Sequence, residues 1–382
     1  MGKSATIYDI ARKAGVSTAT VTRVTSGSPY VKASTRERVQ QIIDECGYVP
    51  SAAAHNLEGS DTRTIGIVMP AVVNPYFDRI YNTVYEVAGQ NGYYAFLMRI
   101  NESQPIPREL IDEIIRRRMD GVIFAGNIWS SRRSGLTDAL GRLRGHMPAV
   151  AICPPATDLD CICIHSDLVS CSRLPVRHLH ALGHRRIAFI GGSMQLKDSS
   201  KRGENFLEEL RALGLCDFPD YHVSCGFDME SGERAVLRML SGLERRQWPT
   251  GMIAFNDLIA LGAMKQLKRM GIRLPEEMAI IGCDDQFFCP YTDPALTSVD
   301  LHPEEMASSA VRELLFAHEN NGEAGDHAFS MMHEATLVVR ESCGAKLGYQ
   351  HHVSRKVRST AKAHSQPPFT VKGNHQRTNP SV

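Results

Sequence analysis

The chain of 382 residues is long enough for two or three domains, and 43% hydrophobic with 22% charged residues is an ordinary globular composition. It holds no run of 18 apolar residues and begins without the apolar segment of a signal peptide, so we expect neither a membrane protein nor a secreted one. Ten cysteines without a Cys-x-x-Cys pair favour reduced thiols over disulfides or a zinc site.

The net charge of +1 hides an asymmetry along the chain. Residues 1–40 hold seven Lys/Arg against two Asp/Glu, and residues 344–382 hold seven Lys/Arg and no acid, so the segment between them is acidic. A basic head on an acidic body predicts that the head binds a polyanion and that the body does not. Ordinary variation of charge along a chain is the alternative at this point.

The head has the pattern of two short helices joined by a tight turn. Thr6 and Asp9 have the spacing of a capping box, and apolar residues follow at helical intervals. Gly15 permits the positive φ of a turn, and Ser17 can cap a second helix over residues 18–25. This arrangement in a basic segment is a helix-turn-helix pattern.

A third helix is expected to complete the head. Ser34 and Glu37 have the spacing of a second capping box, and Gly47 can end the helix. On this pattern alone, a small helical bundle with a basic solvated face remains the alternative to a DNA-binding unit.

In a helix-turn-helix the second helix enters the major groove of DNA. Arg23 can donate two hydrogen bonds to guanine, a pairing that contributes about 1–3 kcal/mol of discrimination. Thr18 and Ala19 are small and offer mainly methyl contacts. The predicted DNA contacts of the head are Thr6, Ser17, Thr18, Ala19, Thr22 and Arg23.

From residue 64 the chain alternates short β-branched runs with amphipathic segments. Strands are expected at 65–69, 94–98, 122–125, 150–153, 187–190, 222–225, 252–255 and 279–282. Helices are expected at 77–90, 108–118, 173–182, 204–213 and 257–270. Such alternation predicts parallel sheets that are covered by helices on both faces.

Ligands of open α/β sheets bind beyond the carboxyl ends of the strands, so the residues that follow each strand carry functional information. At these places, or after the glycine-rich loop that begins at residue 191, the sequence has Asn74, Tyr76, Phe77, Arg202, Phe227, Asn256 and Asp284. Aromatic faces, an arginine, amides and a carboxylate suit a polar small molecule such as a sugar. Two neighbouring acids have simpler expected roles, Asp257 as a helix N-cap and Asp285 in stabilising its loop.

Several motifs occur in one order between Thr6 and Arg340. They are TIYDIARKAGVSTATVTRVTSG, TRERVQQIIDECGYVPSAAAHNL, GHRRIAFIGG, FNDLIALGA, GCDD and DPALTSV. Together they resemble the lactose/galactose repressor (LacI-type) family of bacterial transcription regulators. The resemblance implies a small all-α helix-turn-helix headpiece and a hinge helix, followed by two α/β lobes with parallel sheets, similar to periplasmic binding proteins.

This resemblance also implies domain boundaries. The expected segments are a DNA-binding domain at 1–49, a hinge at 50–60, a two-lobed effector-binding and dimerisation domain at 61–343 and a basic tail at 344–382. The expected lobes are 64–160 with 292–324, and 161–291 with 325–343. The tail has no apolar periodicity, so we expect it to be disordered, and both a phosphate-binding extension and a passive tail remain open.

The hinge is implied to fold on the operator, to pair with its twin from a second subunit and to enter the minor groove. Alone, a helix over residues 52–57 would be too short to be stable. Leu57 matches the position of an apolar wedge that unstacks bases and bends the duplex. The expected minor-groove contacts are Ala53, Ala54, His55 and Leu57. A flexible linker with an incidental leucine is the alternative.

In the body, the resemblance implies effector contacts at Tyr76, Phe77, Arg202, Phe227, Asn256 and Asp284. Core packing is the alternative for Phe77. The chain departs from the family pattern at Cys153, Leu168, Cys171 and Cys283. These residues predict a less polar effector site than a typical sugar site.

The expected function is therefore sequence-specific transcription regulation, with repression the favoured sense and a sugar or related metabolite as effector. Two heads must meet a pseudo-palindromic operator, so we expect a homodimer. No leucine heptad follows the body in the sequence, which favours a dimer over a tetramer. We expect a cytoplasmic, nucleoid-associated protein without cofactor, metal or catalytic step. The alternatives are a solute-binding protein of a transport system, which would need an export signal and no head, and an α/β enzyme, for which the usual catalytic motifs are missing.

Overall fold

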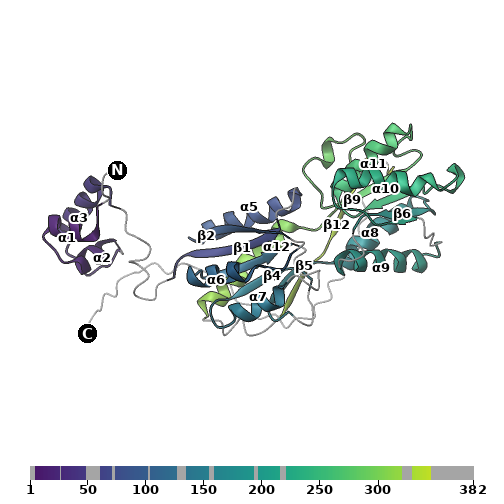
Figure 1. Cartoon of the computed structure of the whole chain (residues 1–382). Coiled ribbons are helices and arrows are strands. Elements are labelled where there is room, and N and C mark those ends of the chain that lie inside the picture. Colours follow the sequence, from purple (N-terminus) through teal and green to yellow (C-terminus); the bar gives the residue numbers. More distant parts are fainter. Residues whose placement is uncertain are drawn as a thin grey trace, which may run out of the picture. The chain divides into compact units, whose positions relative to one another are not determined.

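The computed structural model describes residues 5–25, 27–48, 61–70, 74–101, 104–126, 135–154, 159–192, 197–215, 221–320 and 329–345. These residues form a helical head and two α/β lobes (Figure 1). No helix within these ranges is long and apolar enough to cross a bilayer. The predicted hinge contacts Ala53, Ala54, His55 and Leu57, and the tail from residue 346 onward, lie outside the described residues.

The head consists of three helices around one apolar core. They are α1 (Ile7–Ala14), α2 (Thr18–Thr25) and α3 (Ala33–Cys46). The buried core residues are Ile10, Ala11, Ala14, Val21, Val24, Val39 and Ile43. Thr6 and Asp9 form the predicted capping box, and Gly15 at φ 63° ends α1 so that α2 follows after a tight turn.

The start of α3 differs from the sequence prediction. The helix begins at Ala33, and Lys32 precedes it without a side-chain cap, so the predicted capping box of Ser34 and Glu37 is wrong. Ser34 already lies inside the first turn, where its hydroxyl no longer occupies the capping position. The predicted end is confirmed, since Gly47 closes the helix at φ 56°.

The first lobe is a parallel six-stranded sheet in the order β11-β5-β4-β3-β1-β2. Its strands are β1 (Thr64–Pro70), β2 (Tyr94–Ile100), β3 (Gly121–Ala125), β4 (Ala149–Ile152), β5 (Ile162–Ser166) and β11 (Ser330–His333). Helices α5 (Pro75–Gln90) and α12 (Pro303–Glu319) pack on one face, and α6 (Arg108–Arg116) and α7 (Leu136–Leu143) pack on the other. The predicted parallel sheet with two covered faces is confirmed.

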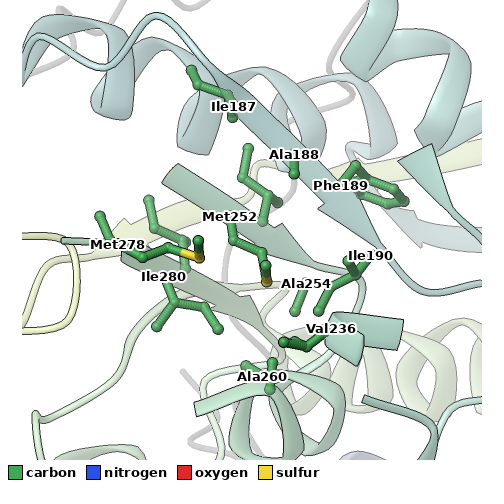
Figure 2. Close-up of a cluster of buried hydrophobic side chains, with 14 of the residues drawn as sticks. Ile187, Ala188, Phe189, Ile190, Val236, Met252, Ala254, Ala260, Met278 and Ile280 are labelled. Atoms are coloured by element: carbon green, nitrogen blue, oxygen red, sulfur yellow. The ribbon is translucent and has the colours of Figure 1, made fainter. Parts of the chain in front are cut away.

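The second lobe has the sheet order β12-β10-β9-β8-β6-β7, in which only β12 runs antiparallel to its neighbour among the described strands. The strands are β6 (Ile187–Ile190), β7 (His222–Val223), β8 (Gly251–Ala254), β9 (Ala279–Cys283), β10 (Thr297–Asp300) and β12 (Thr336–Val338). The helices are α8 (Leu168–Ala181), α9 (Lys197–Ala212), α10 (Met229–Ser241) and α11 (Asp257–Arg269), with short 3₁₀ turns η4 (Arg245–Gln247) and η5 (Cys289–Tyr291). Figure 2 shows Val236 of α10 and Ala260 of α11 close to Ile190 and Ala254 of the sheet.

The strand order corrects the expected borders of the lobes. The segment β5 belongs to the first sheet, β10 to the second and β11 to the first, so each expected border is displaced by one strand. The chain therefore crosses between the lobes after β5, after β10 and after β11. The sequence pattern missed these strands because they mix polar with apolar residues, as in TSVD of β10 and SMMH of β11.

Two glycines let α10 and α11 pack closely. A Cβ atom on Gly262 would lie 1.8 Å from the carbonyl oxygen of Met229, and one on Gly232 would lie 2.3 Å from that of Ile259. The contact is therefore backbone to backbone. It fixes the start of α11 against the start of α10, where predicted site residues lie.

Candidate DNA interface and effector site

The predicted DNA-contacting residues at and in α2, the helix expected in the major groove, are partly exposed and partly half-buried. Ser17, Ala19 and Arg23 are exposed, whereas Thr18 and Thr22 are half-buried. The Oγ of Ser17 accepts the backbone N–H of Thr20 at 3.2 Å, so Ser17 acts as the cap of α2. The hydroxyl of Thr22 donates to the carbonyl of Thr18 at 3.1 Å. Arg23 is thus the one long cationic side chain that α2 exposes.

Thr6, the remaining predicted head contact, lies at the exposed start of α1. Its hydroxyl donates to Asp9 Oδ2 at 2.7 Å, and its backbone N–H donates to the same oxygen at 3.0 Å. These two hydrogen bonds lower the pKa of Asp9. The first turn of α1 is therefore fixed, which positions α1 for α2 to pack against it.

The chain that follows the hinge is anchored to the first lobe by Asp120. Its two carboxylate oxygens accept the backbone N–H groups of Thr62 at 3.0 Å and Thr64 at 3.1 Å. Asp61 pairs with His318 near the end of α12, with Oδ1 and Nε2 3.2 Å apart. Asp61, Asp120 and His318 are near enough to one another to consider a metal, but these contacts explain their closeness without one.

Four predicted effector residues of the second lobe lie around one aromatic pair. The guanidinium carbon of Arg202 lies 4.0 Å from the ring centroid of Phe255, and the rings of Phe255 and Phe227 pack edge to face at 5.3 Å. Asn256 Nδ2 donates to the carbonyl of Phe227 at 2.9 Å. Arg202 is 3% exposed, and its charge acts on the fourth residue, Asp284. The second lobe therefore brings the four side chains together.

Asp284 occupies an unusual position directly after β9. Its backbone has φ 105°, and its neighbour Asp285 has φ 45°, both in the region that L residues rarely adopt. Burial raises the pKa of the Asp284 carboxyl well above its usual range, although the charge of Arg202 and the amide of Asn74 oppose the shift. Burial thus disfavours the charged form of this carboxyl group relative to that of an exposed aspartate.

The first lobe contributes Asn74, Tyr76 and Phe77 at the start of α5. Asn74 caps this helix and donates from Nδ2 to Asp284 Oδ2 at 3.3 Å, which links the two lobes. Tyr76 packs against apolar residues from the crossings between the lobes, and its ring lies edge to face with Phe77 at 5.3 Å. Phe77 also packs on the core of the first lobe, so the alternative of core packing accounts for part of its burial.

Of the two acids with expected structural roles, the prediction for Asp257 is wrong and that for Asp285 is confirmed. Asp257 is not the N-cap of α11, because Asn256 takes that place by accepting the N–H of Ile259 at 2.8 Å. The fully buried Asp257 carboxylate instead accepts Ser298 Oγ at 2.6 Å and the N–H of Gln286 at 2.8 Å. Burial raises its pKa to about 7. Asp285 stabilises its loop as predicted, through an ion pair with Arg340 at 2.6 Å.

The cysteines that depart from the family pattern are buried among apolar side chains. Cys171 and Cys283 belong to a cluster with Val299, Leu301 and Ala335 at the crossings between the lobes. Cys153 is buried in the core of the first lobe. Burial raises the pKa of the Cys283 thiol well above its usual range, so this group stays a neutral thiol. Cys171 and Cys283 thus share an apolar cluster with Tyr76, and the less polar effector site that the sequence indicates stays a prediction.

Sequence reasoning missed three residues around this site, namely Phe255, Arg340 and Arg79. Phe255 was expected as the last residue of a strand, and its place directly before the predicted contact Asn256 was the available signal. Arg79 donates to the carbonyl of Asp284 across 205 positions of sequence at 2.6 Å. No local pattern could predict that contact.

Comparison with known proteins places this arrangement in a family. Residues 6–51 match the family described as bacterial regulatory proteins, lacI family, and residues 176–343 match a periplasmic binding protein-like domain. The repressor PurR of Pasteurella multocida is 30% identical over 345 residues, which cover 90% of this chain and 100% of PurR. This chain belongs to the LacI family. It is a DNA-binding transcription regulator with a body of the effector-binding type.

Two further relatives extend the same similarity. The regulator GalS of Salmonella typhimurium is 33% identical over 339 residues, 88% of this chain and 96% of GalS. The repressor CytR of Escherichia coli is 29% identical over 342 residues, 90% of this chain and 97% of CytR. The similarity of this LacI-family chain to its relatives therefore extends over most of its length.

Solved structures show the same fold. The Lac repressor dimer bound to operator and an anti-inducer has a TM-score of 0.79 at 24% identity, and the match covers 90% of this chain and 100% of that one. The regulator CelR in complex with cellobiose has a TM-score of 0.64 at 26% identity, covering 88% and 99%. The predicted fold of a helix-turn-helix head and two parallel-sheet lobes is confirmed.

Proposed function

We propose that this LacI-family regulator is a homodimeric repressor that binds a pseudo-palindromic operator. A small polar effector that binds between the lobes raises or lowers its affinity for that operator. The observation that carries the proposal is the exposure of Arg23, Ser17 and Ala19 on α2 of a complete three-helix head. The relatives CytR and PurR are named repressors, which supports repression as the sense of regulation.

The operator contacts that we propose divide between two grooves. Arg23 reads a guanine in the major groove, while Thr18, Ala19 and Thr22 supply methyl and hydroxyl contacts beside it. Thr6 and Ser17 lie at helix starts, where backbone N–H groups favour phosphate oxygens. The hinge residues Ala53, Ala54, His55 and Leu57 contact the minor groove, with Leu57 as the wedge.

An exposed apolar surface on the first lobe supports a homodimer. Tyr94 is 70% exposed, Tyr85 56% and Phe96 49%, and they lie on the edge strand β2 and on α5 beside it. An edge strand with large apolar side chains is a surface that monomeric proteins avoid. A second copy would cover it by a two-fold axis and place two heads on the two halves of an operator.

The proposed effector is a carbohydrate or related polar metabolite. Arg202 offers donors and the carboxyl group of Asp284 an acceptor for hydroxyl groups, and Asn256 lies beside Phe227. Phe227 from the second lobe, with Tyr76 and Phe77 from the first, supplies apolar ring faces. We assign no catalytic step, cofactor or metal to this function, and we propose that the regulator acts in the cytoplasm on the nucleoid.

Operator selection from a random duplex library tests this function directly. We expect the full chain to enrich one palindromic sequence, with affinity that falls steeply as salt rises because phosphate contacts release counterions. The Arg23→Ala variant should bind the selected duplex no better than random duplex. The matched control is Arg12→Ala, which removes an equally exposed arginine of the same head that pairs with Asp9 on α1.

The control variant should keep the sequence preference and lose at most general affinity. No enrichment of any palindrome by the unmodified chain would overturn the proposed function. Retained preference in Arg23→Ala would overturn only the assignment of the reading residue. Thermal-shift screening of sugars, sugar phosphates and nucleosides against the full chain tests the effector class.

A further inference from the structure

Arg79 joins the two lobes through a set of hydrogen bonds that the regulatory function has not used so far. It lies in α5 of the first lobe, and its Nη1 donates to the backbone carbonyls of Asp284 at 2.6 Å and Asp285 at 3.3 Å in the second lobe. Both carbonyls belong to the loop after β9. A guanidinium that holds two successive carbonyls fixes the direction of the backbone between them.

The guanidinium is itself held in place from the first lobe. Its Nε donates to Glu304 Oε1 at 2.6 Å and its Nη2 donates to Glu304 Oε2 at 2.8 Å, a bidentate pair. Glu304 lies in the first turn of α12, which packs beside α5 on the same sheet. Two helices of the first lobe therefore present one rigid cation to the second lobe.

The loop that receives this cation is strained. Asp284 and Asp285 both have positive φ, which costs free energy in residues with a side chain. Within the second lobe, Arg340 holds the side chain of Asp285 and Asp257 holds the N–H of Gln286. From the other lobe, Asn74 reaches the side chain of Asp284 at 3.3 Å, and Arg79 is the residue that holds its backbone carbonyl, at 2.6 Å.

We propose that Arg79 is the positioning residue that couples the effector site to the first lobe. It makes the backbone of Asp284, and with it the carboxyl group that faces Arg202, depend on the angle between the lobes. The first lobe continues directly into the hinge, since Asp120 anchors the chain at Thr62 and Thr64. A change at Asp284 is thereby transmitted through Arg79 to α5 and the lobe that carries the head.

This inference rests on the proposed function for its biological meaning, but its physical content can be measured without operator or effector. Spin labels are introduced as unnatural amino acids at Asp138 on α7 and Ser241 on α10, both exposed positions on different lobes. The labelled chain is mixed with excess unlabelled chain, so that pulsed electron resonance reports distances within one subunit. The distance distribution then reports the angle between the lobes.

The central comparison is Arg79→Gln against Arg117→Gln. The control removes the same charge from the same lobe, but Arg117 follows the end of α6 and pairs with Glu113 of that helix at 2.7 Å. We expect the unmodified chain and the control to give the same narrow distribution. Arg79→Gln should broaden it and shift its mean by more than about 2 Å, the scale of a domain rearrangement.

Two more variants separate positioning from general stability. Arg79→Lys keeps the charge but not the fork of donors, so we expect an intermediate shift. Glu304→Gln keeps Arg79 but weakens its orientation, so it should shift the distribution in the same direction. If Arg79→Gln fails to fold, the distance distributions of these two variants are compared with that of the unmodified chain instead.

A distribution for Arg79→Gln that matches the unmodified chain, with Arg79→Lys and Glu304→Gln also unchanged, overturns the inference even if operator selection succeeds. Conversely, a clear shift stands even if no operator is found, and then only the proposed function fails.

Discussion

The close approach of α10 and α11 leads to a quantitative prediction for Gly262→Ala. The added methyl carbon would lie 1.8 Å from the carbonyl oxygen of Met229, and the obstacle is backbone rather than a movable side chain. A Cβ atom in ordinary contact lies 3.4 Å or more from its neighbour, so the two helices must separate by about 1.6 Å.

The expected loss of stability is the difference of two effects. Overpacking of a tight core contact costs about 1–3 kcal/mol, and a backbone obstacle places this site at the upper end, about 3 kcal/mol. Alanine is favoured over glycine inside a helix by about 1 kcal/mol, which offsets part of the cost. We therefore expect Gly262→Ala to lower the free energy of unfolding of the second lobe by about 2 kcal/mol.

Urea unfolding checks this value. Trp248 lies directly after η4 in the second lobe, so its fluorescence, measured in a Trp129→Phe background, follows this lobe. The matched control is Gly141→Ala in α7, where an added Cβ meets nothing within 4 Å. Circular dichroism should show that the control gains about 1 kcal/mol. A Gly262→Ala protein as stable as the unmodified chain would refute the reasoning.

Three other predictions concern Asp257, Arg202 and Leu57. Because burial raises the pKa of Asp257 to about 7, the folded state holds this proton more tightly than the unfolded chain, and the resulting stability is lost as pH rises from about 4 to 7. Asp257→Asn should flatten this pH dependence of the urea midpoint, and equal pH slopes would contradict it. Arg202→Met removes the cation over Phe255 and should abolish thermal shifts by screening compounds while operator selection persists; unchanged shifts would remove Arg202 from the site. Leu57→Ala should reduce both operator affinity and duplex bending in a gel-mobility assay, because the wedge is lost; unaltered bending would contradict this role.

Local signals in the sequence were sufficient for most of the head. Thr6 with Asp9, Gly15 and Gly47 specify their helix ends through neighbours within four residues, and the structure has them as predicted. Ser34 and Glu37 have the same spacing, but the capping box predicted for them is wrong, because the helix already begins at Ala33. A capping pair can form only where no earlier residue starts the helix. Spacing alone does not decide where the helix begins.

In the lobes, local sequence patterns predicted some strands but not those that depend on distant partners. Buried strands such as Ile187–Ile190 are continuous apolar runs and were found, whereas β10 and β11 have the same length but are partly polar. Their membership of a sheet depends on partners far along the chain. The same limit applies to the site, since the position of Asp284 was predicted and its tether Arg79 was not.

The interleaved path of the chain between the lobes has a consequence for biosynthesis. The core of the head is complete once Ile43 has been made, but the first sheet lacks β11 until His333 and the second lacks β12 until Val338. At ordinary rates of translation this interval is on the order of 15–60 s. During this interval the growing chain contains all residues of the head core while neither sheet of the body is complete, so an effector cannot yet act on the head.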